Sequence, residues 1–129
     1  MARLSDLVNV EININKIKIQ GVEIPVIFTF ESFPHVEESY GKPYPEFEKE
    51  MNEMLAKGEF SLGEHEAKLM RSLIYAMVRS GGTECTPTEI KHAIPLYDVP
   101  GIFQVVFEIF NGQNFQIEDM EKLKKDEKK

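Results

Sequence analysis

The fold of this chain is decided by residues 12–41, ININKIKIQGVEIPVIFTFESFPHVEESYG. Apolar and polar residues alternate on both sides of Gln20-Gly21, and the glycine supplies the positive φ that a two-residue hairpin turn requires. The pattern therefore predicts a β-hairpin that buries one face. Pro25 has no N–H to donate to a neighbouring strand, so we expect its strand to lie at a sheet edge.

The alternation changes phase just before this hairpin. Apolar residues occupy even positions up to Ile14 and odd positions at Ile17 and Ile19. Because a one-residue shift moves every side chain to the other face of a strand, we expect a β-bulge or a bend near Asn15 and Lys16. The segment before it, residues 1 to about 9, has little pattern and is expected to be a loose lead-in or an extension of the first strand.

The quoted stretch ends in a short predicted helix. Ser32 is a suitable N-cap, Pro34 then falls in the first turn, where its missing N–H costs nothing, and Gly41 ends the helix. Apolar spacing and capping patterns predict four more helices, over residues 46–57, 61–80, 86–94 and 98–111.

Two of these helices begin with capping boxes, at Ser61 and at Thr86. Gly112 is expected to end the last one. The longest helix, 61–80, should bury a broad face of leucine, isoleucine, methionine and valine. The opposite side carries Lys68, Arg71, Ser72 and Arg79.

These elements define the predicted architecture. The class is α+β: an N-terminal β-hairpin, with a bulge expected at its start, packed on a bundle of four or five short helices. At 129 residues one core is sufficient, so residues 1–117 are expected to form a single domain. Residues 118–129 are rich in charge and are expected to form a flexible tail.

Composition argues against several functional classes. The formal net charge is −7 and the pI is about 5.0, which argues against nucleic-acid binding through lysine and arginine. No apolar run approaches the length of a membrane span, and the start of the chain lacks a secretion signal. Cys85 is the single cysteine, which excludes an internal disulfide and fits the cytoplasm.

Residues suited to catalysis or metal binding do not converge in the sequence. His35, His65 and His92 fall on three separate predicted helices, and Glu64-His65-Glu66 would point about 100° apart on a helix. Gly81-Gly82-Thr83 lacks the lysine and the spacing of a phosphate-binding loop. We therefore expect no enzyme, and no catalytic, cofactor-binding or metal site.

The last predicted helix is more apolar than a surface helix needs to be. Its apolar residues spread over roughly 200° of the helical wheel, whereas a stripe somewhat wider than about 100° is enough for packing on one side. The helix is therefore either central to the core or buries a second face against a partner or another copy of the chain. For the second case the predicted contact residues are Ile102, Phe103, Val106 and Phe110.

The chain also resembles the tail assembly chaperones of long-tailed bacteriophages and prophages. Proteins of that family commonly have a short strand, a glycine turn, a second strand entering a phenylalanine-containing motif, and a glutamate-rich helix ending in Tyr-Gly. The corresponding segments here are residues 17–19, Gln20-Gly21, residues 24–30, Glu37-Glu38 and Tyr40-Gly41. The helix AKLMRSLIYAMVRS and the capping box at Thr86 extend the resemblance, which covers roughly residues 12–112.

The resemblance implies a non-enzymatic role, without cofactors, in the cytoplasm of an infected or lysogenic bacterium. Such chaperones keep the tape measure protein soluble, recruit tail tube subunits around it and are absent from the finished virion. The alternative is a structural or adaptor protein of the particle, such as a tail or head-tail completion protein. Self-association is left open, and neither nucleic acid nor membrane is expected as a partner.

Overall fold

The computed structural model describes residues 2–12, 14–56 and 63–113. Within these ranges the elements follow one another as α1 (Leu4–Leu7), β1 (Asn15–Ile19), β2 (Val22–Val26), the 3-10 turn η1 (Phe30–Ser32), α2 (Phe33–Tyr40), α3 (Tyr44–Ala56), α4 (Glu64–Ser80), α5 (Pro87–Ala93), the 3-10 turn η2 (Leu96–Asp98) and α6 (Val99–Gln113). A two-stranded hairpin followed by helices confirms the predicted α+β class. The predicted tail, 118–129, lies outside the described residues.

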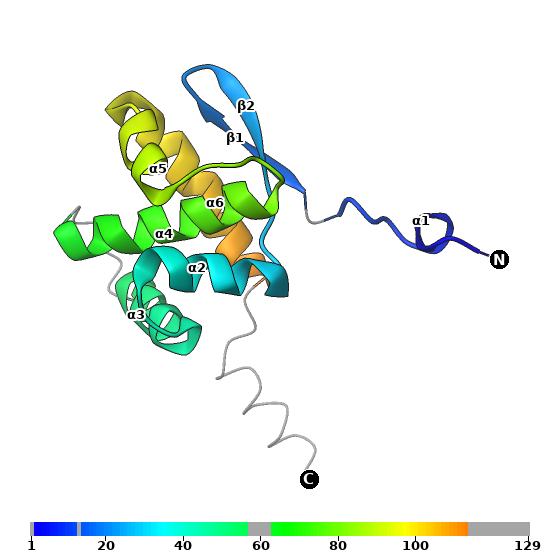
Figure 1. The fold of residues 1–129 in the computed structure, drawn as a ribbon, viewed down its shortest axis with the longest axis horizontal. Helices are drawn as coiled ribbons and strands as arrows, with labels where there is room; N and C mark the ends of the chain where they lie inside the picture. The colour runs from blue at the N-terminus through cyan, green and yellow to red at the C-terminus, as the bar shows by residue number, and fades with distance from the viewer. Residues whose placement is uncertain (1, 13, 57–62, 114–129) are drawn as a thin grey trace, which may run out of the picture.

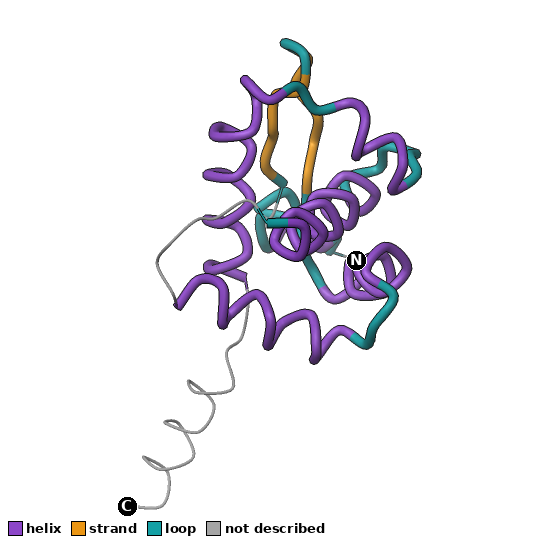
Figure 2. Tube along the Cα trace, turned by 90° about the vertical axis from the view of Figure 1, so that its left-hand side faces the viewer, coloured by secondary structure: helices purple, strands orange, loops and turns teal. Residues whose placement is uncertain are grey.

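Helix α4 is the centre of the helical part. It packs against α2, α3, α5 and α6, and it also contacts β2. Figure 1 shows α4 crossing the middle of the molecule with α2 alongside it, and Figure 2 shows α4 nearly end-on. Because β1 contacts α6 while β2 contacts α4, the hairpin is seated across these two helices.

The hairpin has the predicted turn. Gln20 and Gly21 have φ values of 53° and 78°, as in a type I′ turn, whose twist matches that of paired strands. The antiparallel ladder runs without interruption from Ile19 opposite Val22 to Asn15 opposite Val26. The expected bulge near Asn15 and Lys16 is therefore wrong, but the chain does turn directly before β1, where the N–H of Ile14 donates to the carbonyl oxygen of Glu11. Strand β1 begins only after the change of phase. The apolar residues that precede it at even positions, up to Ile14, therefore lie outside the ladder.

The register also explains Pro25. In a two-residue hairpin the closing pair is hydrogen-bonded and the pairs alternate from there, so Pro25 opposite Lys16 is a non-hydrogen-bonded pair. The missing N–H of Pro25 is thus directed to the outer edge of β2, where the ladder needs no donor. The expectation of an edge strand is confirmed, since β1 and β2 form a sheet of two strands in the described part of the chain.

A close approach joins the hairpin to α4. The N–H of Ile27 donates to the carbonyl oxygen of Met77 at 3.2 Å. Gly81, which follows α4, lies so close to Pro25 that a Cβ at this position would overlap the carbonyl group of Pro25. The absence of a side chain at Gly81 therefore allows β2 to pack against the end of α4.

Helices α2 and α3 depart from the prediction in two ways: the side chain of Ser32 makes no capping hydrogen bond to α2, and the start of α3 is shifted. Helix α2 ends at Gly41, whose φ is 83° and whose N–H donates to the carbonyl oxygen of Glu37. Helix α3 begins at Tyr44, not at Glu46 as predicted, because the side chain of Glu37 accepts a hydrogen bond from the N–H of Tyr44 at 2.8 Å and Pro45 is tolerated in a first turn. The predicted end of this helix, at residues 57 and 58, lies outside the described residues.

Helix α4 is buried more widely than predicted. It ends at Ser80 as expected, whereas the capping box proposed at Ser61 lies outside the described residues. Ser72, assigned to the exposed side, is only 1% exposed and donates to the hydroxyl of Ser39 on α2 at 3.2 Å. The reason is tertiary, since helices pack on several sides of α4.

Helices α5 and α6 confirm one capping pattern and correct two others. Thr86 and Glu89 form the predicted capping box of α5, with hydrogen bonds of 2.9 and 3.1 Å. Helix α6 continues through Gly112, which was expected to end it. Asp98, the expected cap, precedes α6 but accepts a hydrogen bond from the N–H of Gln20 at 2.8 Å.

Candidate functional site

The four residues predicted to contact a partner lie on α6, and three of them are inside the core. Ile102, Val106 and Phe110 are at most 1% exposed, whereas Phe103 is half-buried. The buried three have no accessible surface for a partner in this conformation, so we reassign them to the core. Of the two roles considered for the wide apolar face of α6, the structure therefore shows the core role for most of it.

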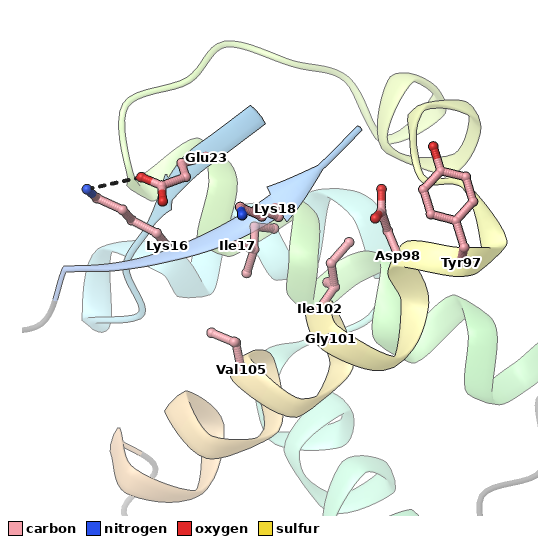
Figure 3. A pocket seen from close by; sticks show the side chains of 9 residues that line it. All are labelled: Lys16, Ile17, Lys18, Glu23, Tyr97, Asp98, Gly101, Ile102 and Val105. Atoms are coloured by element: carbon pink, nitrogen blue, oxygen red, sulfur yellow. Dashed lines mark ion pairs between the residues drawn. The ribbon is translucent and has the colours of Figure 1, made fainter. Parts of the chain in front are cut away.

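A groove of about 360 Å³ lies beside this helix, between β1 and α6. Figure 3 shows Lys16 and Lys18 on the strand side, and Gly101, Ile102 and Val105 on the helix side. The remaining lining residues are Ile17, Glu23, Tyr97 and Asp98. The groove thus combines an apolar wall from α6 with charged side chains of both signs.

The 3-10 turn η2 beside this groove, called the rim below, carries two exposed apolar side chains, Leu96 and Tyr97, of which Tyr97 lines the groove. Their exposed fractions are 85% and 78%. The segment that carries them is held at both ends by Gln20 of the hairpin turn. The side-chain amide of Gln20 donates to the carbonyl oxygen of Ala93, and the backbone N–H of Gln20 donates to the carboxylate of Asp98, both at 2.8 Å. Leu96 and Tyr97 are therefore fixed in an exposed position.

Sequence reasoning did not single out this rim. A three-residue element has no periodicity from which burial could be judged. The available signal was the pair Leu96-Tyr97 between Pro95 and Asp98, outside the apolar stripe of the following helix.

A second cluster of polar side chains joins α2, α3 and α4. The Tyr40 hydroxyl donates to the Glu50 carboxylate, which also pairs with Lys42 and His65 at 3.6 Å each. This donation by Tyr40 is the largest cause that lowers the pKa of Glu50, while burial raises the pKa of Tyr40. A phenol with a raised pKa is a poor proton donor near neutral pH, so the arrangement favours a structural role.

The other candidate reactive groups are held apart. His35 pairs with Glu38 at 3.9 Å, separately from the pair of His65 with Glu50. Burial raises the pKa of the Cys85 thiol, which disfavours the reactive thiolate. Among the described residues, no three histidine, cysteine or acidic side chains are grouped so that they could hold a metal ion.

The basic residues of α4 also separate. Lys68 and Arg71 line a small hollow of about 150 Å³ with Lys91 of α5. Arg79 instead donates to the hydroxyl of Tyr75 at 3.0 Å and to the carbonyl oxygen of Cys85 at 3.3 Å. The three basic residues that the sequence placed on one side of this helix therefore do not form one continuous patch.

Comparison with known proteins gave no match, whether with a family model, a curated protein or a solved structure. No single helix in the described ranges is long and apolar enough to cross a membrane.

Proposed function

We propose that this chain is a non-enzymatic tail assembly chaperone of a bacteriophage or prophage, acting in the bacterial cytoplasm. It binds the tape measure protein and recruits tail tube subunits around it. The proposal rests on the resemblance of residues 12–112 to that family. The observation that carries it is the exposed pair Leu96 and Tyr97 in η2, of which Tyr97 lines the groove between β1 and α6.

This rim is suited to holding an apolar client. Contiguous exposed apolar surface marks sites of protein interaction, and tyrosine is among the residues that contribute most to interface energy. Because η2 is held by Gln20, its backbone loses little freedom when a client binds, which favours affinity.

The groove supplies the rest of the proposed contact. Val105, on the α6 side of the groove, is half-buried. Gly101 faces open space, since a Cβ placed on it would have no atom within 4 Å. An apolar segment of the client can therefore lie along the start of α6, in the way that amphipathic helices occupy grooves. The net charge of −7 keeps the chain soluble while it presents this surface.

The experiment is co-expression with the tape measure protein encoded by a neighbouring gene, followed by affinity capture and size-exclusion chromatography. We expect the client to become soluble and to co-purify. Leu96→Glu combined with Tyr97→Glu should weaken capture by about tenfold or more, as for loss of an interface anchor. Phe30→Glu is the matched control, because Phe30 is 83% exposed and lies outside the groove.

Two outcomes would contradict the proposal. A client that stays insoluble and unbound would favour the structural or adaptor role, and mass spectrometry of purified particles would then find this chain in them. If Phe30→Glu weakens capture as much as Leu96→Glu combined with Tyr97→Glu does, client binding does not depend specifically on the rim.

A further inference from the structure

Strand β1 contacts α6 and forms one wall of the groove described above, but the backbone groups at its outer edge are not used by the ladder. The pairs Ile19–Val22, Ile17–Ile24 and Asn15–Val26 are the hydrogen-bonded pairs of the hairpin. The N–H and C=O groups of Lys16 and Lys18 consequently point away from β2. Among the hydrogen bonds of the described residues, none outside the ladder involves these backbone groups.

The outer edge of β2 is closed by comparison. Pro25 has no N–H, its carbonyl group lies against Gly81, and the next residues are tied to α4 by the bond from Ile27 to Met77. Proline and coverage by another element are two ways in which proteins block strand addition. The hairpin can therefore accept a third strand at β1 and not at β2.

The chain also carries a segment suited to that edge. Residues 2–12 and Ile14 are all exposed, and Figure 1 shows this N-terminal arm projecting away from the helices. Its large apolar side chains are between 46% and 71% exposed: Leu4, Leu7, Val8, Val10, Ile12 and Ile14. The last four alternate along the chain and are β-branched, which favours a strand once a partner edge is present.

We propose that the arm of one copy adds as a third strand to the β1 edge of a second copy, and that the exchange is reciprocal. Charge complementarity favours this occupant: the arm carries Asp6 and Glu11 against Arg3 alone, whereas the β1 edge carries Lys16 and Lys18. Lys16 also faces Glu23 at 3.4 Å. Lys18 forms no ion pair in the described part of the chain, so it is free to meet an acidic side chain of the arm.

The path of the chain favours a second copy over the same one. The N–H of Ile14 donates to the carbonyl oxygen of Glu11 at 3.0 Å, and from this turn the arm runs away from the hairpin (Figure 1). Reciprocal exchange of an identical segment closes two copies into a symmetric dimer. It satisfies the open edges of both hairpins and removes the apolar arm residues from water.

The test is the mass of the full chain in solution, measured by light scattering after size-exclusion chromatography over a range of concentrations. We expect a dimer. Lys18→Pro removes an outward N–H and leaves the hydrogen-bonded pairs of the hairpin intact, so it should convert the dimer to a monomer. Glu23→Pro is the matched control: Glu23 is the partner of Lys18 in the ladder, and its N–H points to the other edge, so the dimer should persist.

A second pair of variants guards against misfolding of Lys18→Pro. Deletion of residues 2–12, or Val10→Asp combined with Ile12→Asp, changes only exposed residues and should also give a monomer that keeps the circular dichroism signal of helices α2 to α6. A wild-type chain that stays monomeric at every concentration would overturn the proposal. So would a dimer that survives removal of the arm, because another surface would then hold it together.

Discussion

Phe110 lies where three parts of the fold meet. Its ring centroid is 6.0 Å from that of Phe28, after β2, and 6.4 Å from that of Phe47 on α3. Its side chain has no exposed surface. The residue therefore links α6 to the hairpin side and to the α3 side of the core at once.

Phe110→Ala is expected to lower the free energy of unfolding by about 3–5 kcal/mol, because it removes buried apolar surface and leaves a cavity. Phe30→Ala makes the same chemical change at a side chain that is 83% exposed and should cost less than about 0.5 kcal/mol. Urea denaturation of both variants measures the difference. Similar losses would show that Phe110 is not a core residue in solution.

Glu50 is a residue whose charge is stabilised by the fold. The pKa of its carboxyl lies below its usual value of 4.5, first because the Tyr40 hydroxyl donates to it and then because Lys42 and His65 are near. The unfolded chain therefore takes up a proton at a higher pH than the folded one. The resulting stabilisation is complete above the unfolded pKa and is lost as the pH falls through the lowered one.

Glu50→Gln should consequently be less stable than the wild type at neutral pH and should lose less further stability in acid. The measurement is urea unfolding at several pH values between about 7 and about 3. Glu53→Gln, on the exposed side of the same helix, serves as the control and should follow the wild type. If the stability of Glu50→Gln falls in acid as much as that of the wild type, the Glu50 carboxylate does not contribute to the pH dependence of stability.

At the scale of the element, α5 shows how much local chemistry decides. It has seven residues, which is too short for a stable isolated helix. Its start is fixed by the reciprocal hydrogen bonds of Thr86 and Glu89, and Ile90 is its buried residue. One cap and one buried side chain thus determine where this helix lies.

Thr86→Ala is expected to lower the free energy of unfolding by about 1 kcal/mol through loss of the cap. Thr88→Ala is the same substitution two residues later, at an exposed helical position, where alanine has the higher helix propensity, so stability should be unchanged or slightly higher. Thermal unfolding of the two variants side by side checks the sign. If Thr88→Ala lowers the stability as much as Thr86→Ala does, the effect of Thr86→Ala does not come from loss of the cap.

Elements set by adjacent residues were the ones that sequence reasoning predicted. The turn at Gln20-Gly21 and the cap at Thr86 depend on backbone preferences of the residues themselves. Gly112 misled because glycine permits a helix to end without forcing it to. For Ile102 the width of the apolar face was read correctly, but periodicity does not tell whether the covering surface belongs to the same chain or to another.

At the scale of the whole molecule, one core connects both strands and helices α2 to α6. A single cluster of buried side chains includes Ile17 of β1, Val26 of β2, Ile90 of α5 and residues of α2, α3, α4 and α6. Elements that share one core lose their packing together. The predicted domain boundaries, residues 1–117, stay a prediction.

Unfolding in urea should therefore be one transition. Far-ultraviolet circular dichroism follows the helices, and tyrosine fluorescence follows the core through Tyr40, Tyr44 and Tyr75, all buried. We expect the two curves to coincide. A separate early transition in either signal would divide the chain into more than one cooperative unit.

The contact between Gly81 and Pro25 has a consequence for synthesis on the ribosome. The hairpin leaves the ribosome early, but β2 can pack on its helix only when the end of α4 follows, and β1 only when α6 does. Until then the nascent strands have no helix to rest on, and their apolar residues are open to other proteins. Completion of α4 ends that interval for β2, because the absence of a side chain at position 81 lets β2 pack against the end of α4.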